Sequence, residues 1–186
     1  MILNILHLIF VNLVFCDPID DIFNAVKNDD ADKLTSILLK EKDSLKTIIN
    51  TRDDQSGETP LMMAILRGRT NIVKVLLGEE SVDVTIPEIG GYTALHGAGY
   101  QGRPEIVKLL LDDKRNLDPN TKHKDGFSPL HRACWGHEKR HTDTVAVFIE
   151  SGKVDWNQTT DDGKTCMEIT KNPNTKKWLT NWSKEL

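Results

Sequence analysis

The sequence predicts an all-α fold, a solenoid of stacked helix-turn-helix units joined by hairpin-like loops. The first indication is a short pattern, Thr or Ser followed by small or apolar residues, that starts at positions 59, 93, 128 and 165. These starts are 34, 35 and 37 residues apart, and a glycine stands two residues before each of them. The second indication is an apolar segment with helical spacing after each of the first three starts. A unit repeated at this period is typical of a solenoid.

The first helix of each unit is expected to begin at the recurring Thr or Ser. A hydroxyl at this position accepts a hydrogen bond from the free N–H groups of the first helical turn. Pro60 and Pro129 follow two of these residues, and proline is tolerated there because that position needs no N–H partner. The four capping residues are Thr59, Thr93, Ser128 and Thr165.

The second helices are predicted from three apolar segments, Ile72–Leu77, Ile106–Leu111 and Thr144–Ile149. Their Ile, Val and Leu residues fall at the i, i+3, i+4 spacing that puts them on one face of a helix. No single unit can bury that face alone, so stacked neighbours are expected to form the core. The third segment lies three residues later in its unit than the other two, which places an insertion between its helices.

The two ends of the array are expected to be capping units. Asp20 to Asn50 fits a degenerate first unit, with helices around residues 22–26 and 33–39. At the other end, Trp178 and Trp182 are four residues apart, and we expect both in the core of the last unit.

These motifs resemble the ankyrin repeat, and Asp118-Pro119-Asn120 and Asp155-Trp156-Asn157 also match that family's step between repeats. The resemblance covers about Thr51 to Trp182 and implies a non-enzymatic scaffold that binds other proteins. We divide the chain into an expected signal peptide (1–16) and an ankyrin repeat domain (17–186). The expected units are 17–52 (N-terminal capping repeat), 53–86, 87–121, 122–158 and 159–186 (C-terminal capping repeat).

Composition and charge agree with a folded protein that binds no nucleic acid. The chain is 38% apolar and 28% charged, and its 24 basic residues are outnumbered by 28 acidic ones, for a formal charge of −4. No run of Lys and Arg forms a stripe that could follow a phosphate backbone. We expect no cofactor, a monomer, and no integral membrane span after signal cleavage.

Gly97, Gly99 and Gly102 match the G-x-G-x-x-G spacing of dinucleotide-binding loops. That fingerprint needs a preceding buried strand, and the residues before Thr93 are instead a turn signal. His96 and His131 are candidates for acid–base chemistry by residue type, but the resemblance implies that they form hydrogen bonds between loops.

A second chemical candidate is the H-E-x-x-H stretch from His137 to His141, the spacing of zinc metalloproteases. Cys134 could add a soft ligand. The stretch lies at the insertion between two helices, and no third ligand stands out. We therefore expect no metal, and keep a metal-dependent hydrolase built on His137, His141 and Cys134 as one alternative function. A secreted or membrane-tethered effector is the other.

The N-terminal residues 1–16 contain no Asp, Glu, Lys or Arg, and their apolar stretch is short for a membrane span. They are interpreted as a secretory signal peptide. Two alternatives stay open: an apolar helix docked on the first unit, or a lipoprotein signal with lipid on Cys16. The last four residues, 183–186, resemble the K-D-E-L class of retrieval signals. The expected location is the secretory pathway, either secreted or in the endoplasmic reticulum lumen, with a cytoplasmic or lipid-anchored protein as the alternative.

In that pathway, Cys134 and Cys166 would meet oxidising conditions. Their different registers in successive first helices favour two buried thiols without a bridge. Asn157 and Asn181 each begin an N-glycosylation sequon. A glycan on Asn157 is expected to compete with the structural Asn of the family's pattern.

The resemblance implies a binding surface on the loop tips and on the concave face of the first helices. In this register, the residues before the caps and four or seven positions after them face outward. Aromatic residues and Arg are enriched in binding hot spots. The expected partner-binding residues are Met63, Tyr92, Tyr100, Phe127, Arg132 and Trp135. Local packing of Phe127 and Trp135 against the insertion is the open alternative, and the partner protein is not identified by the sequence.

Overall fold

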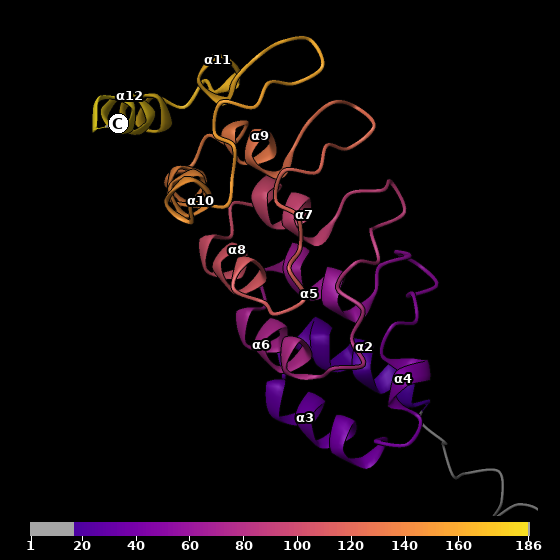
Figure 1. Ribbon diagram of the computed structural model, residues 1–186. Helices are drawn as coiled ribbons and strands as arrows, with labels where there is room; N and C mark the ends of the chain where they lie inside the picture. Colours follow the sequence, from indigo (N-terminus) through magenta and orange to yellow (C-terminus); the bar gives the residue numbers. More distant parts are fainter. Residues whose placement is uncertain (1–16, 186) are drawn as a thin grey trace, which may run out of the picture.

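In the computed structural model, which describes residues 17–185, the helices stack in two columns along a curved array (Figure 1). The first column contains α2 (Pro18–Asn28), α5 (Pro60–Arg67), α7 (Ala94–Tyr100), α9 (Pro129–Cys134) and α11 (Cys166–Ile169). The second contains α3 (Ala31–Lys40), α6 (Thr70–Gly78), α8 (Pro104–Leu111), α10 (Lys139–Glu150) and α12 (Pro173–Glu185). The short α4 (Leu45–Ile48) comes between α3 and α5 along the chain. Since helices are the only regular elements among these residues, the predicted all-α solenoid is confirmed.

Helices α5, α7, α9 and α11 each begin directly after the predicted Thr or Ser, and α2 begins after Asp17. The side-chain oxygens of Thr59, Thr93 and Ser128 accept hydrogen bonds from N–H groups of the first turn. At Thr165 the cap is reciprocal, because the Glu168 carboxylate accepts from the Thr165 N–H at 2.8 Å. Such caps stabilise a helix by about 1 kcal/mol each, which matters for helices as short as these.

Hairpin-like loops precede the first helices and project from one side of the array (Figure 1). Their backbone bonds run from Asp53 N to Glu58 O, from Glu88 N to Tyr92 O, from His123 N to Phe127 O and from Thr160 N to Lys164 O. Gly91 has φ = 95° within its loop, a left-handed conformation that residues with a Cβ rarely adopt. This explains why a glycine recurs two positions before each cap.

The core is a continuous layer between neighbouring units. Ile72, Val73 and Leu76 of α6 are fully buried, as are Val107 and Leu110 of α8. Burying each of these side chains stabilises the fold by about 1.5–3 kcal/mol. The first helices contact one another in order along the array, and so do the second helices.

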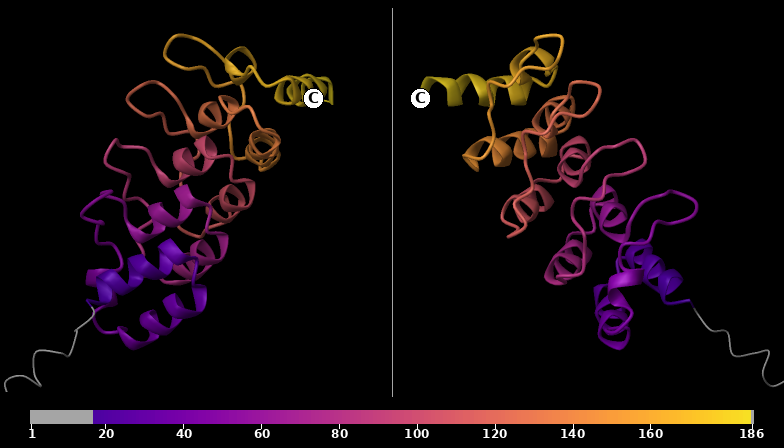
Figure 2. Two further views of the ribbon diagram at one scale, coloured as in Figure 1. Left: turned by 180° about the vertical axis from the view of Figure 1, so that it is seen from behind. Right: turned by 45° about the vertical axis from the view of Figure 1, so that its right-hand side comes forward.

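The end units also match the sequence. Helices α2 and α3 contain the two segments that the sequence assigned to a degenerate first unit. At the other end, Trp178 and Trp182 stack with their ring centroids 5.4 Å apart and pack against the core. Figure 2 shows α12 extending from the end of the stack.

Within residues 17–185, no helix combines the length and apolar character needed to cross a bilayer. The expected signal peptide, including Cys16, lies outside the residues that the structure describes, as does the terminal Leu186.

Candidate functional site

Two large side chains stand exposed at the ends of adjacent first helices. Tyr100 is the last residue of α7 and is 56% exposed, and Trp135 follows the end of α9 and is 44% exposed. Leu66 holds the matching place near the end of α5 and is partly exposed. The repeat thus sets three apolar side chains in a row along one side of the array.

Arg132, on the same helix as Trp135, is nearly buried within a group of aromatic rings. Its guanidinium carbon lies 4.7 Å from the ring centroids of Tyr92 and Trp135 and 4.8 Å from that of Phe127. Cation–π contacts of this kind are attractive and grow stronger when water is excluded. We call Tyr92, Asp125, Phe127, Arg132 and Trp135 the Arg132 cluster.

Asp125, in the hairpin before α9, completes the cluster. Its Oδ2 atom forms an ion pair with Arg132 Nη2 and accepts a hydrogen bond from the Tyr92 hydroxyl at 2.6 Å. Burial acts to raise the pKa of Asp125, but hydrogen bonds from Tyr92, His123 and the Phe127 N–H, together with the Arg132 charge, outweigh it. The pKa of Asp125 is therefore well below its ordinary value of 3.8, and the carboxylate stays charged at neutral pH.

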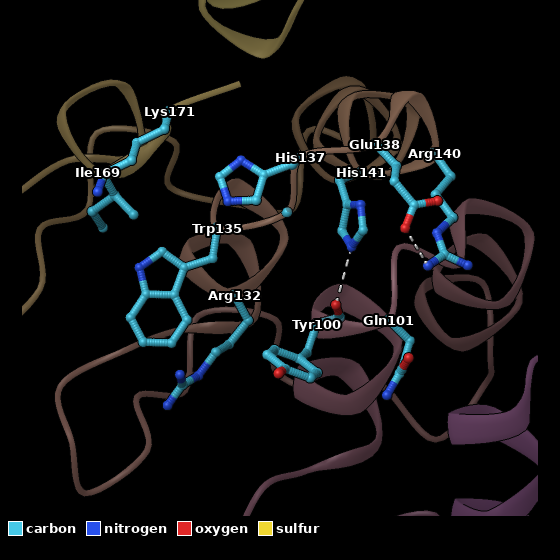
Figure 3. Close-up of a pocket in the computed structure, with 11 residues that line it drawn as sticks. Tyr100, Gln101, Arg132, Trp135, His137, Glu138, Arg140, His141, Ile169 and Lys171 are labelled. Atoms are coloured by element: carbon cyan, nitrogen blue, oxygen red, sulfur yellow. Dashed lines mark hydrogen bonds and ion pairs between the residues drawn. The ribbon is translucent and has the colours of Figure 1, made fainter. Parts of the chain in front are cut away.

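An open groove of about 560 Å³ runs beside this cluster toward the last unit (Figure 3). A second groove of about 390 Å³ adjoins it and extends toward α5. The two grooves share Tyr100, Gln101, Arg132 and Trp135. The large groove also receives side chains from the segment before α10, from the first turn of α10, and from the end of α11 and the residues after it: His137, Glu138, Arg140, His141, Ile169 and Lys171.

The predicted partner-binding residues divide into three groups. Tyr100 and Trp135 are exposed and line both grooves. Tyr92 lines only the smaller groove, and Arg132 lines both, but Arg132 leaves only 7% of its side chain exposed and forms the floor. The prediction for Met63 is wrong: it is fully buried in the core, because α5 packs against α2, α6 and α7 together.

Phe127 and Trp135 pack against each other, with ring centroids 4.8 Å apart at 47°. This packing on Trp135 accounts for Phe127, and it differs from the packing against the insertion that the sequence left open. It accounts for Trp135 only in part, since almost half of that side chain remains exposed.

The two histidines at the third position of their first helices are connectors between units. His96 Nε2 donates to Phe127 O at 3.0 Å, and His131 Nε2 donates to Gln158 O at 2.9 Å. Each ring's Nδ1 faces the hydroxyl of its capping residue, Thr93 or Ser128. The expectation that these histidines hydrogen-bond between loops is confirmed.

The H-E-x-x-H stretch does not form the helical arrangement of a zinc protease. Helix α10 begins at Lys139, and Glu138 before it is extended, so His137 and His141 do not share a helical face. His141 Nε2 donates to Tyr100 O at 3.2 Å (Figure 3), which leaves one ring nitrogen unused. Among residues 17–185, no three His, Cys, Asp or Glu side chains gather in a way that could hold a metal ion.

Cys134 and Cys166 form a disulfide, and the expectation of two unbridged thiols is wrong. Their Cα atoms are 5.7 Å apart, within the usual range for such a bond. The register argument assumed that each first helix stacks in line with the one before it. Successive first helices are instead offset, so that the sixth residue of one lies against the first residue of the next. A Cβ added at Gly99 of α7 would be 2.5 Å from Pro129 O of α9, and Cys134 and Cys166 hold the same two places in α9 and α11. The bond also removes Cys134 as a thiolate ligand.

Asn157 holds the position that Asn50 and Asn120 hold in earlier units. Those two side chains connect units. Asn50 Oδ1 accepts a hydrogen bond from the Asp83 N–H, and Asn120 Oδ1 accepts one from the Asp155 N–H, both at 2.8 Å. Beyond Asn157 no further hairpin unit follows within the described residues, and its side chain is exposed without a hydrogen bond there. The expected competition between a glycan and a structural role is therefore wrong. Asn181 is also exposed, on α12.

Several residues around the groove were not found by sequence reasoning. Asp125 stands directly before the hairpin glycine, where the preceding unit has Gly90, so its charge was not part of the repeat pattern. Ile169 and Lys171 come from the irregular last unit. The recurrence of Arg after the turn between helices, at Arg69 and Arg103, is the one signal in the sequence that could have revealed a charged surface beside the groove.

Comparison with known families agrees with this architecture. A model of three ankyrin repeats matches residues 22–123, and a single ankyrin repeat model matches residues 125–161. The first match alone spans more than half of the chain. The protein belongs to the ankyrin repeat family.

Similar proteins are much longer than this chain. It is 36% identical over 127 residues to BTB/POZ domain-containing protein 1 of Schizosaccharomyces pombe, covering 67% of this chain and 9% of that protein. It is 35% identical over 97 residues to palmitoyltransferase AKR1 of Lachancea kluyveri, covering 52% and 12%. It is 42% identical over 66 residues to ankyrin repeat-containing protein C6C3.08 of S. pombe, covering 34% and 28%. The chain thus spans less than a third of each relative's length, and the likeness is one of repeats.

Proposed function

We propose that this protein is a non-enzymatic interaction module that binds a partner protein in the groove between Tyr100 and Trp135. The observation that carries the proposal is the exposure of these two rings on either side of a groove of about 560 Å³. Exposed aromatic side chains bordering a concave surface are typical of protein-binding sites. The family supports the same class of function, since ankyrin repeats are an interaction scaffold.

The Arg132 cluster supports the proposal by holding the groove in place. Trp135 packs on the Arg132 guanidinium, which is fixed in turn by Asp125 and by Tyr92. A binding surface that is already ordered loses less conformational entropy when a partner binds. The cluster therefore contributes to affinity mainly by positioning Trp135, and the outward faces of Tyr100 and Trp135 make the contacts.

The geometry argues against the alternative of a hydrolase at the H-E-x-x-H stretch. A zinc protease needs both histidines on one helical face with Glu beside the bound water. Here His137 precedes the helix and His141 is bound to the Tyr100 carbonyl. We propose that this stretch forms one wall of the groove.

Affinity capture from the native source tests the proposal. The wild-type protein, the Tyr100→Ala/Trp135→Ala double variant and a Leu39→Ala control are used as baits. Leu39 is 73% exposed on α3, away from the groove, so it controls for the loss of exposed apolar surface. The proposal predicts that one set of proteins is captured by the wild type and the control and is lost from the double variant. Equal capture by all three baits would show that the groove is not the binding surface.

We further propose that the protein resides in the secretory pathway. Two features support this location: the apolar N-terminal residues 1–16 and the Cys134–Cys166 bridge. Disulfides persist in the endoplasmic reticulum and outside the cell, and are rare in the cytosol. Sequencing the N-terminus of the native protein tests the signal peptide: a start at Asp17 supports cleavage, and a start at Met1 contradicts it.

Asn157 is the glycosylation site that we propose for that compartment. It begins the Asn157-Gln158-Thr159 sequon, lies in a turn and has an exposed side-chain amide. Asn181 begins the second sequon but lies within the helix α12, where the sequon is less accessible to a modifying enzyme. We also propose that the module is monomeric, which light scattering of the purified protein checks.

A further inference from the structure

Arg69 and Arg103 occupy matching places before α6 and α8, and each reaches back to the preceding unit. Arg69 Nη1 lies 3.4 Å from Asp29 Oδ2, in the turn between α2 and α3. The Arg103 guanidinium lies against Gly68, since a Cβ added there would be 2.4 Å from Arg103 Cζ. In the next unit the His141 ring holds this place, with its Cδ2 2.8 Å from a Cβ added at Gly102, and the Arg140 stem lies beside it, with its Cγ 3.0 Å from that Cβ.

The turn residues that receive these arginines are equivalent in backbone but different in charge. Asp29, Gly68 and Gly102 all have left-handed backbones, with φ of 60°, 69° and 63°. Asp29 supplies a carboxylate to Arg69. Gly68 supplies no carboxylate to the matching arginine of the next unit, Arg103. Arg103 therefore forms no ion pair with any carboxylate of the described residues, and its buried Nε has no hydrogen-bond partner.

The surroundings of Arg103 leave its charge uncompensated. Burial lowers the pKa of Arg103, and the neighbouring Arg140 lowers it further, while Glu138 acts in the opposite direction. The guanidinium nonetheless stays charged at neutral pH, since its pKa starts from 12.5. A carboxylate placed beside Arg103 by another molecule would therefore find a favourable, partly desolvated partner.

We call Arg69, Arg103 and Arg140 the basic row, and this row meets the groove that Tyr100 and Trp135 line. Arg140 and Lys171 line the groove together with Tyr100 and Trp135 (Figure 3). Glu138 is the one acidic side chain among the lining residues, and it is already paired with Arg140 at 2.8 Å. Lys171 forms no ion pair within residues 17–185. The groove thus carries excess positive charge in a chain whose net charge is −4.

We infer that the partner is an acidic, extended protein segment, which places a bulky apolar side chain between Tyr100 and Trp135 and carboxylates on Arg103 and Lys171. This inference rests on the proposed function of the groove and adds the chemistry of its occupant. The apolar side chain provides buried contact area, and the carboxylates fix the orientation and speed the encounter. Phosphate backbones share the negative charge but lack the apolar side chain that the groove accepts.

A displayed library of random linear peptides, selected on the full-length protein, tests the inference. Peptides that also bind the Tyr100→Ala/Trp135→Ala variant are removed by counter-selection, so the survivors depend on the groove. We expect the survivors to be enriched in Asp and Glu next to Trp, Phe, Tyr or Leu. Their affinity should weaken as salt is raised, because the ion pairs are screened.

Two charge-removing variants identify the residues. Arg103→Met keeps an unbranched side chain but removes the guanidinium that lies against Gly68, and Lys171→Met alters only an exposed side chain. Each should weaken a selected peptide by about fivefold. Lys108→Met is the matched control, since Lys108 is exposed on α8 outside the groove, and it should leave the affinity unchanged.

The outcomes separate this inference from the proposed function. Groove-dependent peptides without acidic enrichment, bound equally by Arg103→Met and Lys171→Met, would overturn the acidic partner and leave the groove as a binding site. A selection that yields no groove-dependent peptide would overturn both. Tighter binding of a DNA oligonucleotide than of any selected peptide would assign the basic row to nucleic acid and also overturn the inference.

Discussion

The Arg132 guanidinium in α9 is ion-paired with Asp125, the residue just before the glycine of the preceding hairpin. The pair joins a loop tip to the helix that carries Trp135, and the Tyr92 hydroxyl bonds to both partners. Two adjacent units are thereby fixed at the point where the groove passes between them.

Replacing Arg132 with Met should destabilise the protein by about 2 kcal/mol. The change removes a charge-assisted hydrogen bond and the cation–π contacts, and it leaves Asp125 without its counter-charge. Urea denaturation followed by circular dichroism measures the effect, with Lys108→Met as a control that should change stability little. Adding Asp125→Asn should cost less than the sum of the two single changes, because both remove one interaction. Strict additivity would show that the two residues do not interact.

Stability should fall as the pH is lowered from about 6.5 to about 4. Burial lowers the pKa of His96 to about 4, against a weaker opposing effect of its bond to Phe127 O. Between these values the unfolded chain binds a proton that the folded chain does not, so unfolding becomes easier as pH falls. Burial also lowers the pKa of His131 and of His141, which adds to the effect in the same direction.

The variant His96→Gln isolates the contribution of His96. Its side-chain amide can still donate to Phe127 O but does not titrate. The free energy of unfolding should therefore depend less on pH in this window than it does in the wild type. An unchanged slope would mean that His96 titrates normally in the folded protein.

Reduction of the Cys134–Cys166 bond should destabilise the last unit. The two cysteines are 32 residues apart in sequence. Closing a loop of that length lowers the conformational entropy of the unfolded chain, which stabilises the folded state by about 3–4 kcal/mol. Thermal unfolding with and without a reducing agent measures the loss. The Cys134→Ser/Cys166→Ser variant, which cannot be reduced, should unfold at one temperature under both conditions. An equal shift in that variant would assign the effect to the reagent.

Asn157→Gln should remove an N-linked glycan from the protein expressed through a eukaryotic secretory pathway. The expected result is a loss of mass equal to that released by glycosidase treatment of the wild type. The stability of the folded unit should be unchanged, since the Asn157 side chain forms no hydrogen bond within the described residues. A glycosidase-insensitive wild type would contradict both the site and the proposed compartment.

The regular part of the fold could be predicted because residues within each unit mark where its hairpin turns and where its first helix begins. Thr59, Thr93 and Ser128 cap their helices, and the glycines before them turn the hairpins. These are local effects of residue type on the backbone, so spacing alone reveals them. The connecting roles of His96 and His131 followed from the family resemblance.

The binding surface was predicted less completely, because it depends on contacts between units. The register placed Met63 on the same face as Arg132, but the packing of α5 against α2, α6 and α7 buries it. The disulfide was missed because successive first helices are offset, so that the sixth residue of one, such as Cys134, lies against the first residue of the next, such as Cys166. The basic row depends on a glycine in one unit and an arginine in the next, a relation that no single repeat contains.

The central claim is that a partner occupies the groove between Tyr100 and Trp135, and site-specific photo-cross-linking tests it most directly. A photoreactive phenylalanine analogue is placed at Tyr100 in one protein and at Leu39 in another, and each is irradiated with the captured partner. The account predicts a covalent adduct from position 100, lost when Trp135 is also changed to Ala, and none from position 39. An adduct from position 39 alone, or equal adducts from both positions, would contradict it.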